Sequence, residues 1–376
     1  MAGWTLLDIQ NKTRELTGSP SQDQLSNTAL NNYINNYYTL IMPFELKEQI
    51  QLEFIKFETF AGIDVYPFPG NFLTDQPMAY ADGYPLIFYQ DPDIFYQDWP
   101  IQIAADNLAS GDGVTTTFFG GFYNPPIIIG SVTLTDGIQI LNDSGNPSTS
   151  QTIAIGSGIT PYTGTLFAFP IKPGSLSVTD GIETFVDNGA GLLTGNLGGT
   201  GTINYSTGIW NVTFNTAVVV GVSIVGTFQV ISQVGILEGD GIGTINYITG
   251  AYSVSFDFAP LNGATIYSKY QGYQPTRPQG VLFFNNQFTF RPVPDQVYQI
   301  QMQGYINPIQ LTNLTDAPML PEWGQLIAYG AALDVFASRG DLGNYDRYYP
   351  IMKRFENVAL ARTIQQFQAE QSVPRF

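Results

Sequence analysis

Apolar residues near the start of the chain recur at helical spacing. Those between residues 6 and 16 predict a first helix, and the sequence Thr-Gly-Ser-Pro at 17–20 predicts its end. A second helix is expected over residues 27–38, where apolar positions follow the i, i+3, i+4, i+7 pattern and Ser26 or Asn27 can cap the first turn. The chain is therefore predicted to open with two helices.

The same spacing returns near the end of the chain. Pro321 and Glu322 favour a helix start, and apolar or small residues line one face of the segment that follows. A last helix is expected over residues 345–368, interrupted or kinked near Pro350. Both ends of the chain are therefore predicted to be helical.

Alternating apolar and polar residues between these helices predict strands. One strand begins at Gln51, and the aromatic stretch from Pro85 is interpreted as further β structure broken by prolines. Residues 281–292 predict a hairpin that turns at its two central asparagines, and another strand follows from Gln296.

Because helical ends enclose these strands, residues 1–105 and 273–376 are expected to form one discontinuous domain, a helical core with a few strands. The segment between them has a different composition. From 106 to 272 its only basic residues are Lys172 and Lys269, whereas the flanks carry the other twelve of the 14 Lys and Arg. We therefore interpret the middle of the chain as an insertion.

The insertion contains two duplicated stretches. The first type, called A, runs from Pro126 to Gly145 and again from Pro170 to Gly189, with identical residues at half of the aligned positions. The second type, called B, opens with GTINYSTG at Gly201 and with GTINYITG at Gly243. Each unit has the strand, turn, strand pattern that is typical of a β-sandwich.

The units follow one another along the chain as A, A, B, B. The simplest account is nesting, in which an inner sandwich at 159–229 interrupts an outer one formed by 106–158 and 230–272. Crosswise pairing of A and B units in one larger sandwich is the alternative. The predicted fold is thus α+β and multidomain, a helical core with inserted all-β, Ig-like sandwich domains.

The composition limits the chemistry. The 376 residues include no histidine and no cysteine, which removes the commonest metal ligand, histidine-based triads and thiol chemistry. A formal net charge of -17 argues against gripping nucleic acid through its phosphates. No apolar run approaches the ~18 residues of a membrane span. We therefore expect no enzyme, cofactor, metal or membrane contact.

Repeated acidic turns are the most tempting candidates for a site. Asp136 and Asp180 each precede a glycine between β-branched runs, as hairpin turns require. Calcium binding or glycosidase chemistry would need several further oxygen ligands or a second carboxylate at a defined separation. Glu238 and Asp240 are interpreted as solvated acids of a loop. The glycine-rich run from Gly189 lacks the GK[ST] ending of a phosphate-binding loop and is also interpreted as a loop.

An aromatic cluster follows the first strands. Phe88, Tyr89, Phe95, Tyr96 and Trp99 lie close together in the sequence among prolines. Such side chains can stack on a sugar or form a subunit interface, but core or interface packing is the preferred interpretation.

Three segments, in their order, resemble the head-to-tail adaptor or ring proteins of tailed bacteriophages, including those of crAss-like podoviruses. They are the opening LLDIQNKTRELTGSPSQDQLSNTALNNYINNYY, the strand pair FTFRPVPDQVYQIQMQGYINP, and a close in which an LPEW helix start precedes a small-residue YGAA helix and a Tyr/Arg-rich final helix. The resemblance covers roughly residues 1–100 and 275–376. The long insertion departs from compact members of that family.

The resemblance implies a structural virion protein at the head-tail junction, assembled in the host cytoplasm. Its helices would pack side by side in a homo-oligomeric ring beneath the portal protein, commonly of about twelve copies, and leave a channel for DNA ejection. The partners would be the portal and other tail or ring proteins, with DNA only as passing cargo. In that family the C-terminal segment often reaches onto the portal.

Basic side chains of the last helix are expected to meet acidic neighbours across such a ring. The candidate ring and portal interface residues are Trp323, Tyr329, Arg347, Lys353, Arg354, Arg362 and Phe376. The alternative function is that of a receptor- or carbohydrate-binding tail protein, which would use the β modules for binding and the helices as an anchor.

Overall fold

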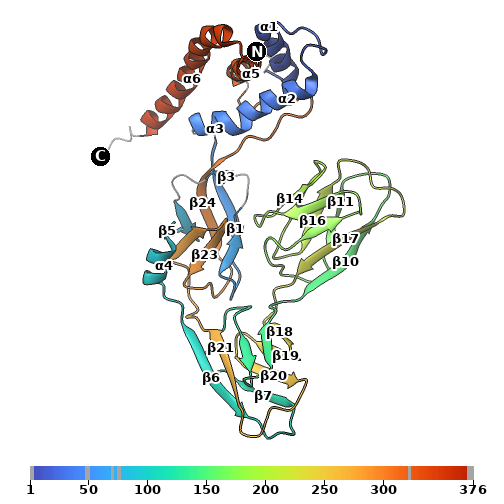
Figure 1. The fold of residues 1–376 in the computed structure, drawn as a ribbon, viewed down its shortest axis with the longest axis vertical. Helices are drawn as coiled ribbons and strands as arrows, with labels where there is room; N and C mark the ends of the chain where they lie inside the picture. The colour runs from blue at the N-terminus through green and yellow to red at the C-terminus, as the bar shows by residue number, and fades with distance from the viewer. Residues whose placement is uncertain (1–3, 47–50, 69–71, 74–77, 321–322, 371–376) are drawn as a thin grey trace. The chain divides into compact units, whose positions relative to one another are not determined.

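The chain divides into two compact units, which are described one by one. The helical unit comprises residues 1–54, 71–76 and 303–376, and the β unit comprises residues 55–70 and 77–302. The structure is a computed structural model, and it describes residues 4–46, 51–68, 72–73, 78–320 and 323–370 (Figure 1).

The helical unit is built from both ends of the chain. Its elements are α1 (Leu6–Thr17), α2 (Asn27–Asn36), the π-helical turn η1 (Tyr37–Ile41), α3 (Met42–Glu45), α5 (Trp323–Arg339) and α6 (Leu342–Glu370). The central helix, α5, packs against α1, α2 and α6. Its apolar and small side chains lie at the centre of a single hydrophobic core.

Local signals set the ends of the first two helices. Thr5 and Asp8 form a capping box at the start of α1, and Gly18 closes the helix with a φ of 60°. The Ser26 hydroxyl accepts the backbone N–H of Ala29 and so caps α2. Both predicted helices are confirmed, although α2 passes into a π-helical turn two residues before its expected end.

The last helix is longer than expected. α6 begins three residues early and passes through Pro350 without interruption. The proline is exposed, so water can satisfy the backbone carbonyl that loses its N–H donor. The expected start of the preceding helix, at Pro321 and Glu322, lies outside the described residues.

Strands of the two flanks form a mixed sheet in the order β1-β24-β4-β5-β22-β23-β2, with β3 paired to β24. The predicted hairpin is confirmed, because Asn285 and Asn286 turn between β22 and β23 with φ values of 51° and 59°. The strands are β1 (Leu52–Glu58), β2 (Val65–Pro67), β3 (Phe72–Leu73), β4 (Ala79–Ala81), β5 (Tyr84–Tyr89), β22 (Gly280–Phe284), β23 (Gln287–Arg291) and β24 (Gln299–Ile306).

The aromatic stretch from Pro85 is only half strand. After β5 the chain forms helix α4 (Pro92–Asp98), which Asp91 caps. Phe95 of this helix is buried with Tyr89, and Tyr96 and Trp99 pack against them. Four of the five aromatic residues therefore pack into a core, and the fifth, Phe88, is half-buried on β5. β structure was the wrong prediction for α4, because a capping aspartate followed by proline starts a helix.

Two further sheets of eight antiparallel strands each are called the outer and the inner module. The outer module contains β6 (Ile103–Ser110), β7 (Thr117–Gly121), β8 (Thr133–Thr135), β9 (Ile140–Asp143), β18 (Val234–Gly239), β19 (Gly241–Asn246), β20 (Ala251–Phe256) and β21 (Thr265–Gln271). The inner module contains β10 (Ser148–Ile155), β11 (Tyr162–Thr165), β12 (Ser177–Thr179), β13 (Thr184–Asp187), β14 (Leu192–Gly195), β15 (Thr200–Ile203), β16 (Ile209–Thr213) and β17 (Ser223–Gln229).

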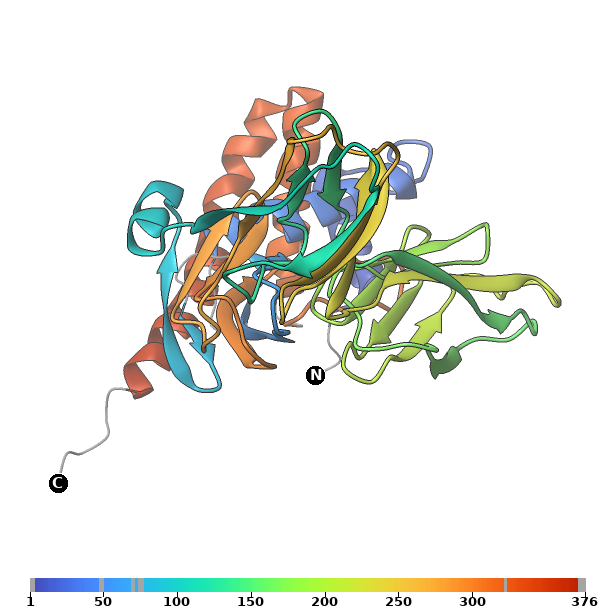
Figure 2. The same ribbon diagram turned by 90° about the horizontal axis from the view of Figure 1, so that it is seen from below.

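The two modules share one topology. The strand orders are β6-β21-β8-β9-β18-β19-β20-β7 and β10-β17-β12-β13-β14-β15-β16-β11. Numbered along each module, both read 1-8-3-4-5-6-7-2, and the inner module interrupts the outer one between its fourth and fifth strands. Figures 1 and 2 show each sheet curving around its own interior.

The predicted fold class is wrong. The chain is mostly β, with barrel-like or half-barrel sheets, and does not consist of a helical core with a few strands and Ig-like sandwiches. Period-two alternation led to this error, because a single curled sheet and a two-sheet sandwich both place every second side chain inside. The flanks also do not form one domain, since most of their strands belong to the β unit.

Two boundaries differ from the sequence interpretation. Strand β10, assigned to the outer domain within 106–158, pairs with β17 of the inner module. The first residues of β6, assigned to the core, pair with β21 in the outer module. The duplicated A and B units do not include these strands, so their similarity gave no signal for the boundary.

Candidate functional site

The repeated phrase GTINY contributes a buried tyrosine to each module. In the inner module the Tyr205 hydroxyl donates to Asp187 Oδ1 over 2.6 Å. The same carboxylate accepts the backbone N–H of Gly174 and of Gly189, at 2.7 and 2.9 Å. Burial raises the pKa of Asp187, against the lowering effect of these hydrogen bonds. The buried carboxylate therefore has hydrogen-bond donors within the module. We call this hydrogen-bonded pair of tyrosine and aspartate the clamp.

The outer module repeats this clamp. Tyr247 donates to Asp143 Oδ1 over 2.6 Å, and the N–H groups of Gly130 and Gly145 donate to the same carboxylate. Each clamp joins one A unit to one B unit of the same sheet, so the repeated phrase has a structural role in both modules.

The acidic turns are structural as well. Asp136 Oδ1 accepts the backbone N–H groups of Ile138 and Gln139, and Asp180 Oδ1 accepts the two equivalent groups in the inner module. The predicted Asp-Gly turns are confirmed. Asp240 accepts the N–H of Ile140, and Glu238 is exposed. The described part of the chain contains no group of three or more acidic side chains that could hold a metal ion.

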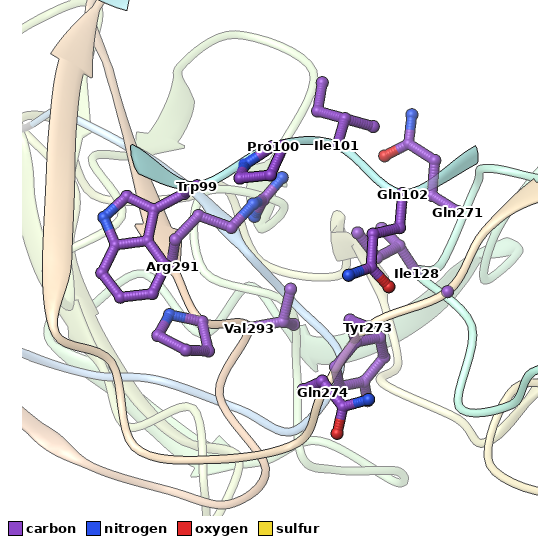
Figure 3. Close-up of a pocket in the computed structure, with 12 residues that line it drawn as sticks. Trp99, Pro100, Ile101, Gln102, Ile128, Gln271, Tyr273, Gln274, Arg291 and Val293 are labelled. Atoms are coloured by element: carbon purple, nitrogen blue, oxygen red, sulfur yellow. The ribbon is translucent and has the colours of Figure 1, made fainter. Parts of the chain in front are cut away.

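A pocket of about 240 Å³ lies in the β unit beside the two connections into the outer module (Figure 3). Trp99 and Arg291 lie on one side of it, and Gln102 and Tyr273 lie on the other. Burial, followed by the charges of Asp295 and Asp64, raises the pKa of Tyr273 to about 12. The full lining is Trp99, Pro100, Ile101, Gln102, Ile128, Gln271, Gly272, Tyr273, Gln274, Arg291, Pro292 and Val293.

The chemistry of this pocket is neutral. Arg291 forms an ion pair with Asp64 at 2.6 Å, which neutralises the charged group of the lining. The side chains of Gln102, Gln271 and Gln274 form no hydrogen bond with any described residue. Aromatic rings together with free amides suit a small uncharged ligand that carries hydroxyl or amide groups.

Two of the candidate interface residues lie in the core of the helical unit. Trp323 is 2% exposed and packs edge-on against Tyr38, with 6.4 Å between ring centroids. Tyr329 is partly buried and contacts the rings of Tyr348 and Phe355. The helix-start pattern that singled out Trp323 thus marks packing inside a protomer, and a side chain so deeply buried offers no surface to a partner.

The basic candidates on α6 separate into two kinds. Lys353 Nζ lies 2.6 Å from Glu356 Oε2 and 3.7 Å from Glu45 Oε2, so its charge is used within the protomer. Burial lowers the pKa of Lys353, but the two carboxylates outweigh burial and the net shift is upward. Arg347 and Arg354 are exposed and form no ion pair with any described residue.

The two remaining candidate interface residues are Arg362 and Phe376. Arg362 is in α6, but its side chain is outside the described part of the structure, and Phe376 lies outside the described residues altogether.

The exposed side of α1 carries two acids that were not among the interface residues predicted from the sequence. Leu7, Asp8, Asn11 and Glu15 are exposed, whereas the opposite side of the helix is buried against α5. Hydrogen bonds from the Thr5 side chain and backbone lower the pKa of Asp8 and keep it ionised. The available signal was the spacing of these two acids on one helical face.

No protein-family model, curated protein or solved structure matches the chain. Among the helices in the described ranges, none combines the length and the apolar character that a membrane crossing requires.

Proposed function

We propose that the chain is a structural virion protein that forms a ring in the head-to-tail connector below the portal. Its ring would line the DNA conduit and dock tail components. The observation that carries this proposal is the helical unit, which presents two unlike faces. α5 packs against both α1 and α6, which lie to either side of it (Figure 1). Exposed acids lie on α1, and the exposed Arg347 and Arg354 lie on α6, so the two helices carry opposite charges on different sides of α5.

Two unlike faces favour head-to-tail contact. In such a heterologous interface one patch of a protomer meets a different patch of the next, and a rotation that closes gives a ring. A surface that paired with itself would instead give a twofold dimer. The resemblance of both flanks to ring proteins points to the same assembly, with about twelve copies.

The charge of the chain suits a channel through which DNA passes better than a surface that binds DNA. A formal net charge of -17 repels phosphate groups and gives few sites for counterion release. DNA would therefore pass through such a ring without being retained.

The β unit offers surfaces to other tail proteins. Its two modules leave large apolar side chains in solvent, among them Phe119 at 83% and Phe258 at 76% exposure. Exposed side chains of this size are candidates for protein contacts when a neighbour covers them.

Mass photometry of the purified full-length chain, alone and with the portal protein of the same virion, tests the proposal. The expected result is a discrete ring-sized species in at least one of the two samples. A chain that stays monomeric in both samples and does not bind the portal would contradict it.

A second candidate function is carbohydrate or receptor binding, which the neutral pocket beside the outer module favours. A glycan array with the full-length chain would then give a specific signal that Gln102→Ala together with Gln274→Ala removes. Gln287→Ala, an exposed glutamine on β23 outside the pocket, is the matched control. Absence of any glycan signal would contradict carbohydrate binding and would not affect the ring proposal.

A further inference from the structure

The exposed face of α6 combines basic and apolar side chains. Arg347, Ile351, Arg354 and Val358 are all exposed, and their spacing of four, three and four residues places them on one side of the helix. We call this set the basic face. Arg347 lies over the ring of Tyr348 on its own helix, 5.6 Å from the centroid.

Neither Arg347 nor Arg354 forms an ion pair with a described residue. The chain has 31 acidic residues against 14 basic ones, so a second copy offers more carboxylates than cations to a free arginine. The side chains of Lys12, Arg291 and Lys353 do form ion pairs. Arginines that remain free beside exposed Ile351 and Val358 fit an acidic and partly apolar partner.

The exposed face of α1 has the complementary character. Asp8 and Glu15 supply the charges, and Leu7, 44% exposed, supplies apolar surface. We call this set, with Asn11 between the two acids, the acidic face. Glu15 is paired only with Lys12 of its own helix, at 2.9 Å, and its side chain is 69% exposed. An exposed pair of this kind exchanges partners at little cost.

The spacing of charge is the same on both faces. Glu15 lies seven positions after Asp8, and Arg354 lies seven positions after Arg347. At ~1.5 Å per residue this is roughly 10 Å on each helix. Two helices packed side by side can therefore form both ion pairs at once, and bidentate arginine contacts would hold their register.

We infer that the basic face of α6 in one protomer docks on the acidic face of α1 in a second copy of this chain. The inference rests on the proposed ring and names its contact. Because the two faces belong to helices on different sides of α5, each protomer would contribute a different face to each neighbour. Repetition of this contact builds a ring.

Charge reversal tests the contact in the full-length chain. Arg347→Glu together with Arg354→Glu is expected to weaken self-association by at least about tenfold, measured by mass photometry across a dilution series. Lys56→Glu together with Lys269→Glu changes the net charge equally at exposed positions of β1 and β21 and is expected to leave association unchanged. Circular dichroism checks that each variant retains its helices.

A swap of partners identifies the acidic face. Glu15→Arg alone should weaken association, and it leaves the Asp8 cap of α1 intact. In parallel helices Glu15 would meet Arg354, so Glu15→Arg combined with Arg354→Glu restores association. In antiparallel helices Glu15 would meet Arg347, so Glu15→Arg combined with Arg347→Glu restores it. Failure of both combinations to recover association overturns the inference.

The remaining outcomes are also decisive. If the wild-type chain assembles and the double arginine variant assembles equally well, the contact is wrong while the ring proposal stands. If the arginine variant fails but Glu15→Arg has no effect, the basic face binds something other than α1, and the inference is overturned. If the wild-type chain never assembles, alone or with the portal, the ring proposal and this contact fail together.

Discussion

Tyr205 and Asp187 lie in different duplicated units, and the tyrosine hydroxyl donates to the aspartate Oδ1 over 2.6 Å. Asp187 is buried, and its other two hydrogen bonds come from glycine N–H groups of two adjoining turns. This contact ties the second A unit to the first B unit. Tyr247 and Asp143 form the same contact between the first A unit and the second B unit.

Removing the Tyr205 hydroxyl should destabilise the inner module. Tyr205→Phe leaves the buried carboxylate of Asp187 without its strongest donor, which is expected to lower the free energy of unfolding by about 1–3 kcal/mol. Urea unfolding followed by tryptophan fluorescence, to which the buried Trp210 of this module contributes beside the three other tryptophans, measures the change. Tyr123→Phe, at a side chain that is 73% exposed, should stay within ~0.5 kcal/mol. Overlapping curves for Tyr205→Phe and wild type would argue against the clamp.

Asp187 should make stability depend on pH. Burial raises its pKa in the folded chain, so the folded state holds the proton more tightly than the unfolded state, where the pKa is ~3.9. The contribution of this group is therefore fully present below about pH 3.9 and is lost as the pH rises through the raised pKa.

The variant Asp187→Asn, which cannot titrate, isolates this effect from the other carboxylates. The unfolding free energy of wild type minus that of the variant is expected to fall as the pH rises from about 4 through the raised pKa of Asp187. Parallel urea titrations across this range measure the difference. A difference that stays constant or rises with pH would show that the folded-state pKa is not raised.

The helical unit should depend on the absence of a side chain at Gly330. A Cβ atom there would lie 2.4 Å from the ring of Tyr37, which is buried in the same core. Gly330→Ala is expected to cost about 1–3 kcal/mol and to lower the melting temperature of the helical signal in circular dichroism. At Gly343 the nearest atom is 3.9 Å away, so Gly343→Ala should be neutral or slightly stabilising. Equal melting of the two variants would contradict this packing.

Local signals in the sequence predicted local structure well. The end of α1, the cap of α2, the asparagine hairpin and the Asp-Gly turns each follow from a few adjacent residues with a specific backbone requirement. The sheet architecture does not follow from such signals. Alternation specifies which side chains face inward, but it does not say whether one sheet curls or two sheets stack.

The candidate interface was only partly visible in the sequence. The helical pattern identifies Arg347 and Arg354 as exposed charges. It does not show that Lys353, one residue before Arg354, forms ion pairs with Glu45 and Glu356. The motif at the start of α5 predicts an interface position for Trp323, but this side chain lies in the core. Which charge is free and which aromatic ring is buried depends on the packing of α5 between α1 and α6, and that packing joins residues about 300 positions apart.

Electron cryo-microscopy of the assembled chain, alone or on its portal, tests the central claim most directly. We predict a closed ring with a central channel, in which the helical units of neighbouring protomers make the lateral contacts and α6 of one meets α1 of the next. A reconstruction in which the chain is monomeric, forms a twofold dimer, or sits at the virion surface away from the portal would contradict the account.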